Sequence, residues 1–311
     1  MKQSINIPQY DNNHYAVVDL GSNSFHLLIV RLQDNNVVVV NKVKEKVRLA
    51  AGLNEQCELS MAAINNGLNC LHLFAQHLAS IPVSQIRIVA TATLRIAKNR
   101  DEFLTQANKI LPLNINLLSG EQEAHTIYRG VAHTCKNKLV QKRLVIDIGG
   151  ASTELIIGEG FNALKAVSLN LGCVSFKERF FTDGELTPEN FNAAISAATA
   201  IVKPICTDFI HLNWQSVVGS SGTMRAIAEI LAFHQRPEII TADFLQQLQA
   251  ELIKCKSIDN ICLAGLRVDR APVLASGLSI LIALFNCLSI KELKLSEGAL
   301  REGLLYELLP H

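Results

Sequence analysis

The chain has 311 residues, of which 49% are hydrophobic and 18% are charged, and its formal net charge is +1. This composition excludes a disordered chain and allows about two domains of ~150 residues each. The near-neutral charge excludes a long-range field that would attract nucleic acid or an anionic membrane. A polyanionic ligand would therefore have to be bound by local geometry.

The cysteines and the first ten residues indicate a cellular compartment. Eight cysteines are scattered along the chain, contain no C-x-x-C spacing and lie mostly in apolar segments. Such cysteines behave as small hydrophobic residues and are typical of a reducing environment. Residues 1–10 are polar and contain no apolar run of the kind found in an export signal. We therefore expect a cytoplasmic protein.

Taken in chain order, the first half alternates strands and helices. The pattern predicts a strand–turn–strand unit over 17–29, a basic strand over 37–47, and a helix capped by Ser60. A short strand over 86–91, a helix over 101–111, a strand over 115–118 and a helix from 119 follow. This alternation predicts an α/β fold with a parallel or mixed sheet.

The second half repeats the plan. The pattern predicts a hairpin over 144–157, a strand over 164–171, helices from Cys173 and Pro188, and a strand that enters the Gly219–Thr223 turn. Helices near 241–255 and 270–288, a strand over 291–295 and a helix over 297–309 complete it. Pro204 is expected to kink or split its helix.

Residues 271–288 carry no charge and approach the length that spans a bilayer. Proline, glycine, serine and asparagine interrupt the run, so we expect a buried helix and no membrane partner.

The most informative stretch is the turn of the hairpin 144–157. Glycine allows the backbone to approach a ligand closely, and a row of N–H groups in such a turn binds anions such as phosphate. The carboxylates of Asp147 and Glu154 would repel phosphate unless a cation such as Mg²⁺ lay between them. A simple tight hairpin is the alternative interpretation.

A second copy of this stretch favours the functional interpretation. Asp19, Gly21 and Ser24 align at one constant spacing with Asp147, Gly149 and Ser152, and apolar strands flank both turns. Two such units indicate an internal duplication, with two lobes that each contribute a loop to a shared cleft.

Three further features can contribute chemistry. Arg95 follows the strand over 86–91 and could donate to a phosphoryl oxygen or simply pair with a surface acid. Glu121 and Glu123 lie in the first turn of a helix. An acid at this place either caps the helix N-terminus or orients a water molecule for attack on phosphorus. The glycine-rich turn Gly219–Thr223, including Ser221 and Gly222, could receive phosphate at a helix N-terminus.

Seven segments in this order resemble one family, the exopolyphosphatase / guanosine pentaphosphate phosphohydrolase (Ppx/GppA) family, and the guanosine pentaphosphate branch most closely. They are D-L-G-S-N-S-F-H at 19–26, V-R-L-A-A-G-L at 47–53, V-A-T-A-T-L-R at 89–95, S-G-E-Q-E-A with I-Y-R-G-V-A-H-T at 119–134, V-I-D-I-G-G-A-S-T-E-L at 145–155, G-S-S-G-T at 219–223 and L-S-E-G-A-L-R-E-G-L-L-Y-E at 295–307.

The resemblance implies two ribonuclease-H-like lobes of the actin/Hsp70/sugar-kinase fold, with boundaries expected at 1–125 and 126–311 and the last helix packing back on the first lobe. It implies Glu123 as the catalytic base, with Glu121 on a variable position, and Arg95 as a phosphate-binding arginine. It places the metal on Asp147, Glu154 and Asp19. The phosphate loops it implies are Gly21, Ser22, Asn23 and Ser24, and Gly149, Gly150, Ala151, Ser152 and Thr153.

The activity that the resemblance implies is Mg²⁺-dependent hydrolysis of a terminal phosphoanhydride, from pppGpp to give ppGpp, or from polyphosphate. Gln122 stands where the family has a first acid, and we expect Glu123 to suffice. The helical domains of longer relatives are expected to be absent, which favours short or nucleotide substrates. The alternatives are a short-chain exopolyphosphatase, a kinase or ATPase, and a non-catalytic ppGpp sensor; a homodimer stays open as a partner.

Overall fold

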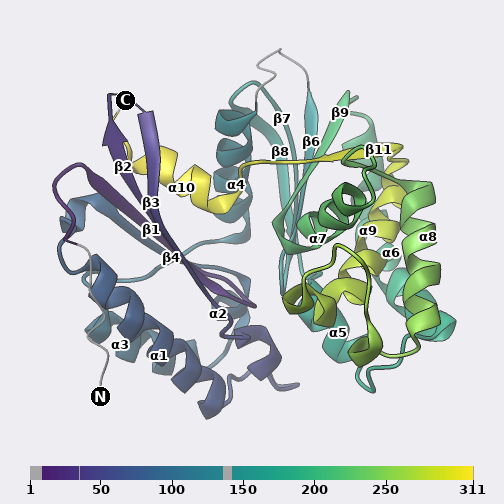
Figure 1. Ribbon diagram of the computed structural model, residues 1–311, viewed down its shortest axis with the longest axis horizontal. Helices are drawn as coiled ribbons and strands as arrows, with labels where there is room; N and C mark the ends of the chain where they lie inside the picture. The colour runs from purple at the N-terminus through teal and green to yellow at the C-terminus, as the bar shows by residue number, and fades with distance from the viewer. Residues whose placement is uncertain (1–8, 35, 136–141, 311) are drawn as a thin grey trace. The chain divides into compact units, whose positions relative to one another are not determined.

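The computed structural model describes residues 9–34, 36–135 and 142–310 (Figure 1). Its contacts divide the chain into two compact units, unit 1 with Met1–Ser119 and Leu304–His311, and unit 2 with Gly120–Gly303. The sequence predicts this boundary after residue 125. In the structure, the helix that carries Glu123 belongs to unit 2.

Unit 1 contains a five-stranded sheet in the order β3-β2-β1-β4-β5. β1 pairs antiparallel with β2 and parallel with β4. The strands are β1 (His14–Leu20), β2 (Phe25–Gln33), β3 (Asn36–Glu45), β4 (Ile86–Ala90) and β5 (Asn116–Leu117), and the helices are α1 (Met61–Leu78), α2 (Ala92–Ile96) and α3 (Arg100–Ile110). Figure 1 shows α1 and α3 beside each other, and their apolar faces form one core with β1 and β2.

Unit 2 contains a six-stranded sheet in the order β10-β11-β9-β6-β7-β8. Its strands are β6 (Arg143–Ile148), β7 (Thr153–Glu159), β8 (Asn162–Leu169), β9 (Ser216–Ser220), β10 (Ile239–Thr241) and β11 (Glu292–Leu295). The helices are α4 (Gly120–Thr134), α5 (Cys173–Phe180), α6 (Pro188–Ile210), α7 (Ser221–Phe233), α8 (Ala242–Cys255) and α9 (Leu274–Leu288); α10 (Leu300–Leu308) ends the chain and spans the division between units.

The two sheets confirm the duplication that the sequence predicted. In each sheet a three-stranded antiparallel meander is followed by parallel strands, because β6 pairs with β7 and β9 as β1 pairs with β2 and β4. The parallel pairs then continue through β5 in unit 1 and through β11 in unit 2. One local sequence pattern therefore specifies the same topology twice.

Two local predictions differ from the structure, and one element was not predicted. Arg95 lies in the short helix α2, not at the end of a strand. Helix α6 continues through Pro204 without being split. Because Ala200, four residues before the proline, is exposed, water can satisfy the carbonyl group that loses its partner. The short edge strand β10 was not predicted.

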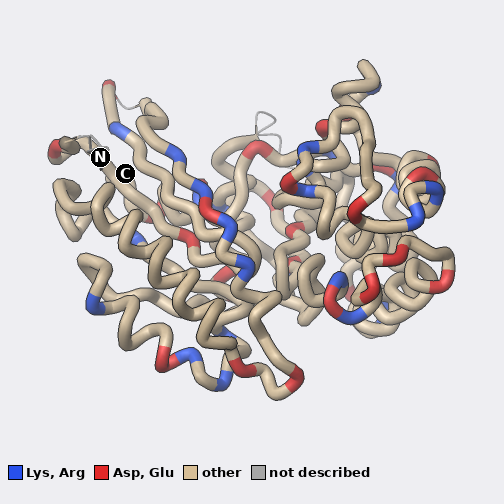
Figure 2. Tube along the Cα trace, turned by 60° about the horizontal axis from the view of Figure 1, so that its bottom comes forward, with Lys and Arg blue, Asp and Glu red and all other residues tan. Residues whose placement is uncertain are grey.

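The apolar segment expected to be a buried helix is buried. Val268–Leu288 and Pro188–Ile210 are long and apolar enough to cross a membrane by length and composition, but 78% of the first segment's window is buried inside the protein. Both signs of charge are interspersed along the described chain (Figure 2), in keeping with its small net charge. These features fit the interpretation of residues 271–288 as a core helix.

Candidate active site

The acids of unit 2 lie opposite each other in the β6–β7 hairpin. Asp147 on β6 is the register partner of Glu154 on β7, so both side chains lie on the same face of the sheet. Each carboxylate accepts a hydrogen bond from a neighbouring strand on that face. The Ser220 hydroxyl donates to Asp147, and the Ser168 hydroxyl donates to Glu154 at 2.7 Å.

Burial dominates the electrostatics of this pair. Asp147 is 7% exposed and Glu154 is 1% exposed. Burial raises the pKa of Asp147, although hydrogen bonds from Ser220 and Ser221 oppose the shift. Burial, and then the charges of Glu123 and Asp147, raise the pKa of Glu154 well above its usual value. A bound cation would relieve this repulsion between buried carboxylates.

Glu123 reaches this cluster from α4. This helix packs against β6, β7 and β8, and Glu123 is 6% exposed on its buried side. Glu121 lies two residues earlier, and its side chain is 79% exposed beside His125. The two glutamates that the sequence could not separate by spacing alone therefore differ in burial, and Glu123 is the one whose charge acts on Glu154.

The second glycine loop is fixed by the start of α5. The Gly149 carbonyl oxygen accepts from the Cys173 N–H, and the Gly150 carbonyl oxygen accepts from the Val174 N–H, both at 2.9 Å. A Cβ atom at Gly172 would lie 2.3 Å from the Gly150 carbonyl oxygen, so only glycine permits this approach. The hydrogen bonds from α5 thus hold the carbonyl groups of Gly149 and Gly150 on the side of the loop that faces α5.

The turn 219–223 enters α7 beside the same loop. The Ser221 hydroxyl donates to the Ile148 carbonyl oxygen at 2.6 Å, and Ser221 has a φ of 77°, a strained conformation for a residue with a side chain. A Cβ atom at Gly222 would meet nothing within 4 Å. Arg270 donates to the Gly222 carbonyl oxygen and pairs with Glu229 at 3.1 Å.

The equivalent loop of unit 1 has a similar geometry. Asp19 on β1 pairs in register with His26 on β2. A Cβ atom at Gly21 would lie 2.9 Å from the Ser24 carbonyl oxygen, and one at Gly149 would lie 3.1 Å from that of Ser152. The Ser22 and Asn23 carbonyl oxygens accept from the backbone of residues 48–50, so a segment after the third strand fixes this loop as well.

Arg95 lies at the same end of the unit 1 sheet as this loop. Its helix α2 begins after β4, and β4 runs parallel to β1, so the carboxyl ends of both strands meet at one edge. The Arg95 guanidinium donates to the Leu118 carbonyl oxygen at 3.0 Å. This bond orients a half-buried arginine from within its own unit.

The carboxylates of unit 2 suit a hard cation that is shared with substrate. Across residues 9–34, 36–135 and 142–310, no three His, Cys, Asp or Glu side chains form a metal centre by themselves. Mg²⁺ is usually held by one or two carboxylates, with water and substrate phosphates as the remaining ligands. Asp147 and Glu154 fit that donor set, and their burial and mutual repulsion favour a cation.

Comparison with known proteins identifies the family. Residues 28–311 match the sequence profile of the Ppx/GppA phosphatase family. The chain belongs to this family. A guanosine-5'-triphosphate,3'-diphosphate pyrophosphatase of Vibrio cholerae is 50% identical over 99% of this chain and 61% of its own length, and that of Aliivibrio fischeri is 51% identical over 95% of this chain and 59% of its own. The chain thus spans about three fifths of these Ppx/GppA relatives.

Solved structures confirm the fold. An exopolyphosphatase from Cytophaga hutchinsonii superimposes with a TM-score of 0.85 at 21% identity, covering 95% of this chain and 97% of its own. A PPX-GPPA enzyme of Aquifex aeolicus gives 0.75 at 23% identity, covering 94% and 99%. The chain therefore shares the fold of these Ppx/GppA structures, and its two sheets show the expected duplicated α/β unit.

Sequence reasoning missed the residues that orient the acids. Ser220 and Ser168 donate to Asp147 and Glu154, yet neither was singled out. Ser220 had a usable signal, because it lies inside the predicted glycine-rich turn 219–223, although only Ser221 and Gly222 were named there as phosphate-binding residues. Ser168 had none, since only the β7–β8 register places it opposite Glu154.

Proposed function

We propose that this chain is a phosphoanhydride hydrolase that removes the terminal phosphate of pppGpp to give ppGpp. The observation that carries the proposal is the buried cluster of Asp147 and Glu154 on one face of the unit 2 sheet and Glu123 on α4, in which burial, and then the charges of Glu123 and Asp147, raise the pKa of Glu154. The name of the 50% identical relatives supports the choice of substrate.

The residues of unit 2 have distinct roles in this proposal. Glu123 accepts a proton from water as the water oxygen attacks the terminal phosphorus. The anhydride bond between the terminal phosphorus and ppGpp breaks, so ppGpp is the leaving group and the terminal group is released as phosphate. The loop of Gly149, Gly150, Ala151, Ser152 and Thr153, and the turn with Ser221 and Gly222, offer backbone N–H groups to phosphate oxygens. The Gly149 N–H is not one of these donors, because it closes the loop on the Ser152 carbonyl oxygen at 2.9 Å. Asp147 and Glu154 hold Mg²⁺, which supplies positive charge to the phosphates.

The residues of unit 1 are proposed to bind phosphate oxygens as well. Gly21, Ser22, Asn23 and Ser24 form the equivalent loop, and Arg95 offers a planar fork of donors. Asp19 is proposed on the metal side, by its alignment with Asp147. The internal duplication supports these assignments, because the two loops align at one constant spacing.

Two further properties are proposed from the chain itself. All eight cysteines are free, which supports a reducing, cytoplasmic location. A small or polymeric phosphoanhydride, bound by the local geometry of the loops, is proposed as the partner, and the small net charge supports no field for nucleic acid or membrane. A homodimer remains a prediction.

The decisive experiment measures phosphate release with Mg²⁺ from pppGpp, long polyphosphate and ATP, using the wild type, Glu123→Gln and Glu121→Gln. Loss of a general base lowers turnover by about 10²–10⁴-fold, and we expect this for Glu123→Gln with substrate binding retained. Glu121→Gln is the matched control on the exposed side of α4 and should retain activity.

Each other outcome assigns a different function. Release mainly from polyphosphate would make the chain an exopolyphosphatase, and substrate-dependent ADP formation would make it a kinase. Tight ppGpp binding without phosphate release from any substrate would favour a sensor. Full activity of Glu123→Gln would refute the assigned base.

A further inference from the structure

A pocket lies in unit 2, at the end of the strands opposite to the candidate catalytic acids. It has a volume of about 640 Å³ and is lined at the starts of β6, β9 and β11. Arg143 begins β6 and Ser216 begins β9, whereas Asp147 and Ser220 lie at the other ends of these strands. The pocket is therefore separate from the candidate active site.

The register explains why this part of the sheet is open. Arg143 pairs with Ser216, and Val218 pairs with Lys294, so these side chains share the face that carries Asp147 and Glu154. On that face α4 packs against β6, β7 and β8. The pocket extends over β9 and β11, beyond the strands that α4 covers, and its volume is within the range of small-molecule sites.

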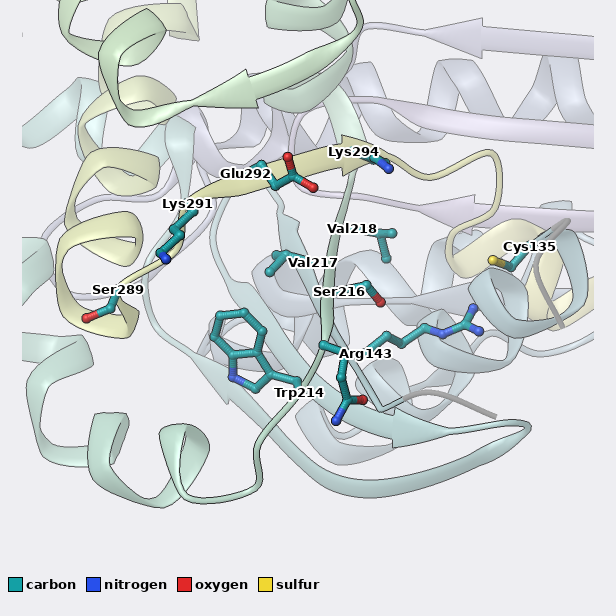
Figure 3. Close-up of a pocket in the computed structure, with 11 residues that line it drawn as sticks. Cys135, Arg143, Trp214, Ser216, Val217, Val218, Ser289, Lys291, Glu292 and Lys294 are labelled. Carbon is teal, nitrogen blue, oxygen red and sulfur yellow. The ribbon is translucent and has the colours of Figure 1, made fainter. Parts of the chain in front are cut away.

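The lining is strongly basic. Lys291, Lys294 and Arg143 surround the pocket, with Glu292 as its single carboxylate. Figure 3 shows Lys291 and Trp214 at one end and Arg143 and Cys135 at the other. Within the described parts of the chain, neither Lys291 nor Lys294 forms an ion pair. The exposed Lys291 and Lys294 give this concave surface a positive charge that attracts a ligand with several negative charges, whereas Arg143 is buried and has contacts of its own.

The polar groups of the lining also favour an acceptor-rich ligand. The indole N–H of Trp214 is buried and has no hydrogen-bond acceptor among the described residues. Leaving such a donor unsatisfied is costly. Because the N–H is closed off from solvent, an anionic oxygen in the pocket could accept from it only after the indole ring turns. The hydroxyl of Ser216 is a further donor in the same wall. Phosphate groups, which offer many acceptor oxygens, match this set better than a single carboxylate.

We propose that this pocket is a second binding site of the chain, for a small anion that carries two or more phosphate groups. Inorganic oligophosphate and a nucleoside polyphosphate share this chemistry. The site does not depend on the proposed hydrolase activity, because none of its lining residues belongs to the catalytic cluster.

Trp214 allows a direct test, since it is the chain's only tryptophan and its fluorescence reports on this pocket. The full chain is titrated without divalent cations, so that turnover is prevented, using tripolyphosphate and GTP, with sulfate at matched ionic strength as the salt control. We expect a saturable change with tripolyphosphate and none with sulfate. Tighter binding of GTP would identify a nucleotide as the source, and equal binding would identify the oligophosphate alone.

Charge variants separate this site from any other anion site. Lys291→Ala/Lys294→Ala should weaken binding by about tenfold, and Glu292→Gln should strengthen it. Lys203→Ala/Lys254→Ala, two exposed lysines elsewhere in unit 2, is the matched control and should leave the dissociation constant unchanged. A response that does not saturate, or equal dissociation constants in the two double variants, would overturn the proposal.

Discussion

The β1–β2 hairpin of unit 1 and the β6–β7 hairpin of unit 2 have the same backbone plan but different chemistry. Asp19 and Asp147 occupy equivalent positions, yet the register partner of Asp19 is His26 and that of Asp147 is Glu154. Of these two hairpins, only β6–β7 therefore places two carboxylates opposite each other in register. The duplication thus preserved the glycine turn, while the position of His26 and Glu154 beside it distinguishes the acidic hairpin.

The segments that fix the two loops differ in the same way. In unit 1 the loop carbonyl groups are held by a short 3-10 turn, Leu49–Gly52, and its preceding residue Arg48. In unit 2 the N-terminus of α5 does so, and Gly172 permits the contact. Each loop thus depends on the chain that follows its third strand.

Of the changes that test this comparison, the largest effect is expected from replacing Glu154, the residue that distinguishes the two hairpins. Glu154→Gln should lower phosphate release by about 10²-fold, because it removes one carboxylate from the proposed cation site. His26→Gln, the equivalent change in unit 1, should have a much smaller effect. The measurement is kcat for both variants at saturating Mg²⁺. Equal losses would break the assignment of the acidic chemistry to unit 2.

A pH series of unfolding tests the burial of Glu154. The pKa of Glu154 in the folded state lies well above 4.5, the ordinary value that applies in the unfolded state. At a pH between the unfolded and the folded pKa, the folded state therefore holds a proton that the unfolded state has lost. The unfolding free energy therefore falls as pH rises through this range, because the buried carboxylate must ionise. Glu154→Gln removes this contribution.

The stability of the variant relative to the wild type should accordingly increase from acidic to neutral pH and then level off above the folded pKa. Urea unfolding of both proteins without divalent cations measures the difference at each pH, and subtraction removes the contribution of other groups. A difference that does not change with pH would show that Glu154 titrates normally.

A smaller effect is expected at the contact that fixes the second loop. Gly172→Ala places a Cβ atom against the backbone of Gly150 and Ala151, and such overpacking costs about 1–3 kcal/mol of unfolding free energy. Gly222→Ala is the control, since its Cβ atom meets nothing within 4 Å. Denaturant unfolding compares the two, and equal stabilities would show that the loop tolerates displacement.

The sequence by itself determined the duplication, the order of strands and helices, and the two glycine loops. These features are local: apolar periodicity fixes the elements, and Gly21 and Gly149 make the close approaches that their turns require. The N-cap at Ser60 was readable for the same reason, because it accepts from the backbone N–H of Ala63 three residues on.

Tertiary structure alone decided which side chains become buried together. Glu121 and Glu123 have the same sequence environment, but only the packing of α4 on β6–β8 makes Glu123 buried and Glu121 exposed. The strand registers likewise place Ser168 and Ser220 on the acids and leave a basic pocket over β9 and β11. Burial and register depend on residues far apart in the chain, so no local pattern encodes them.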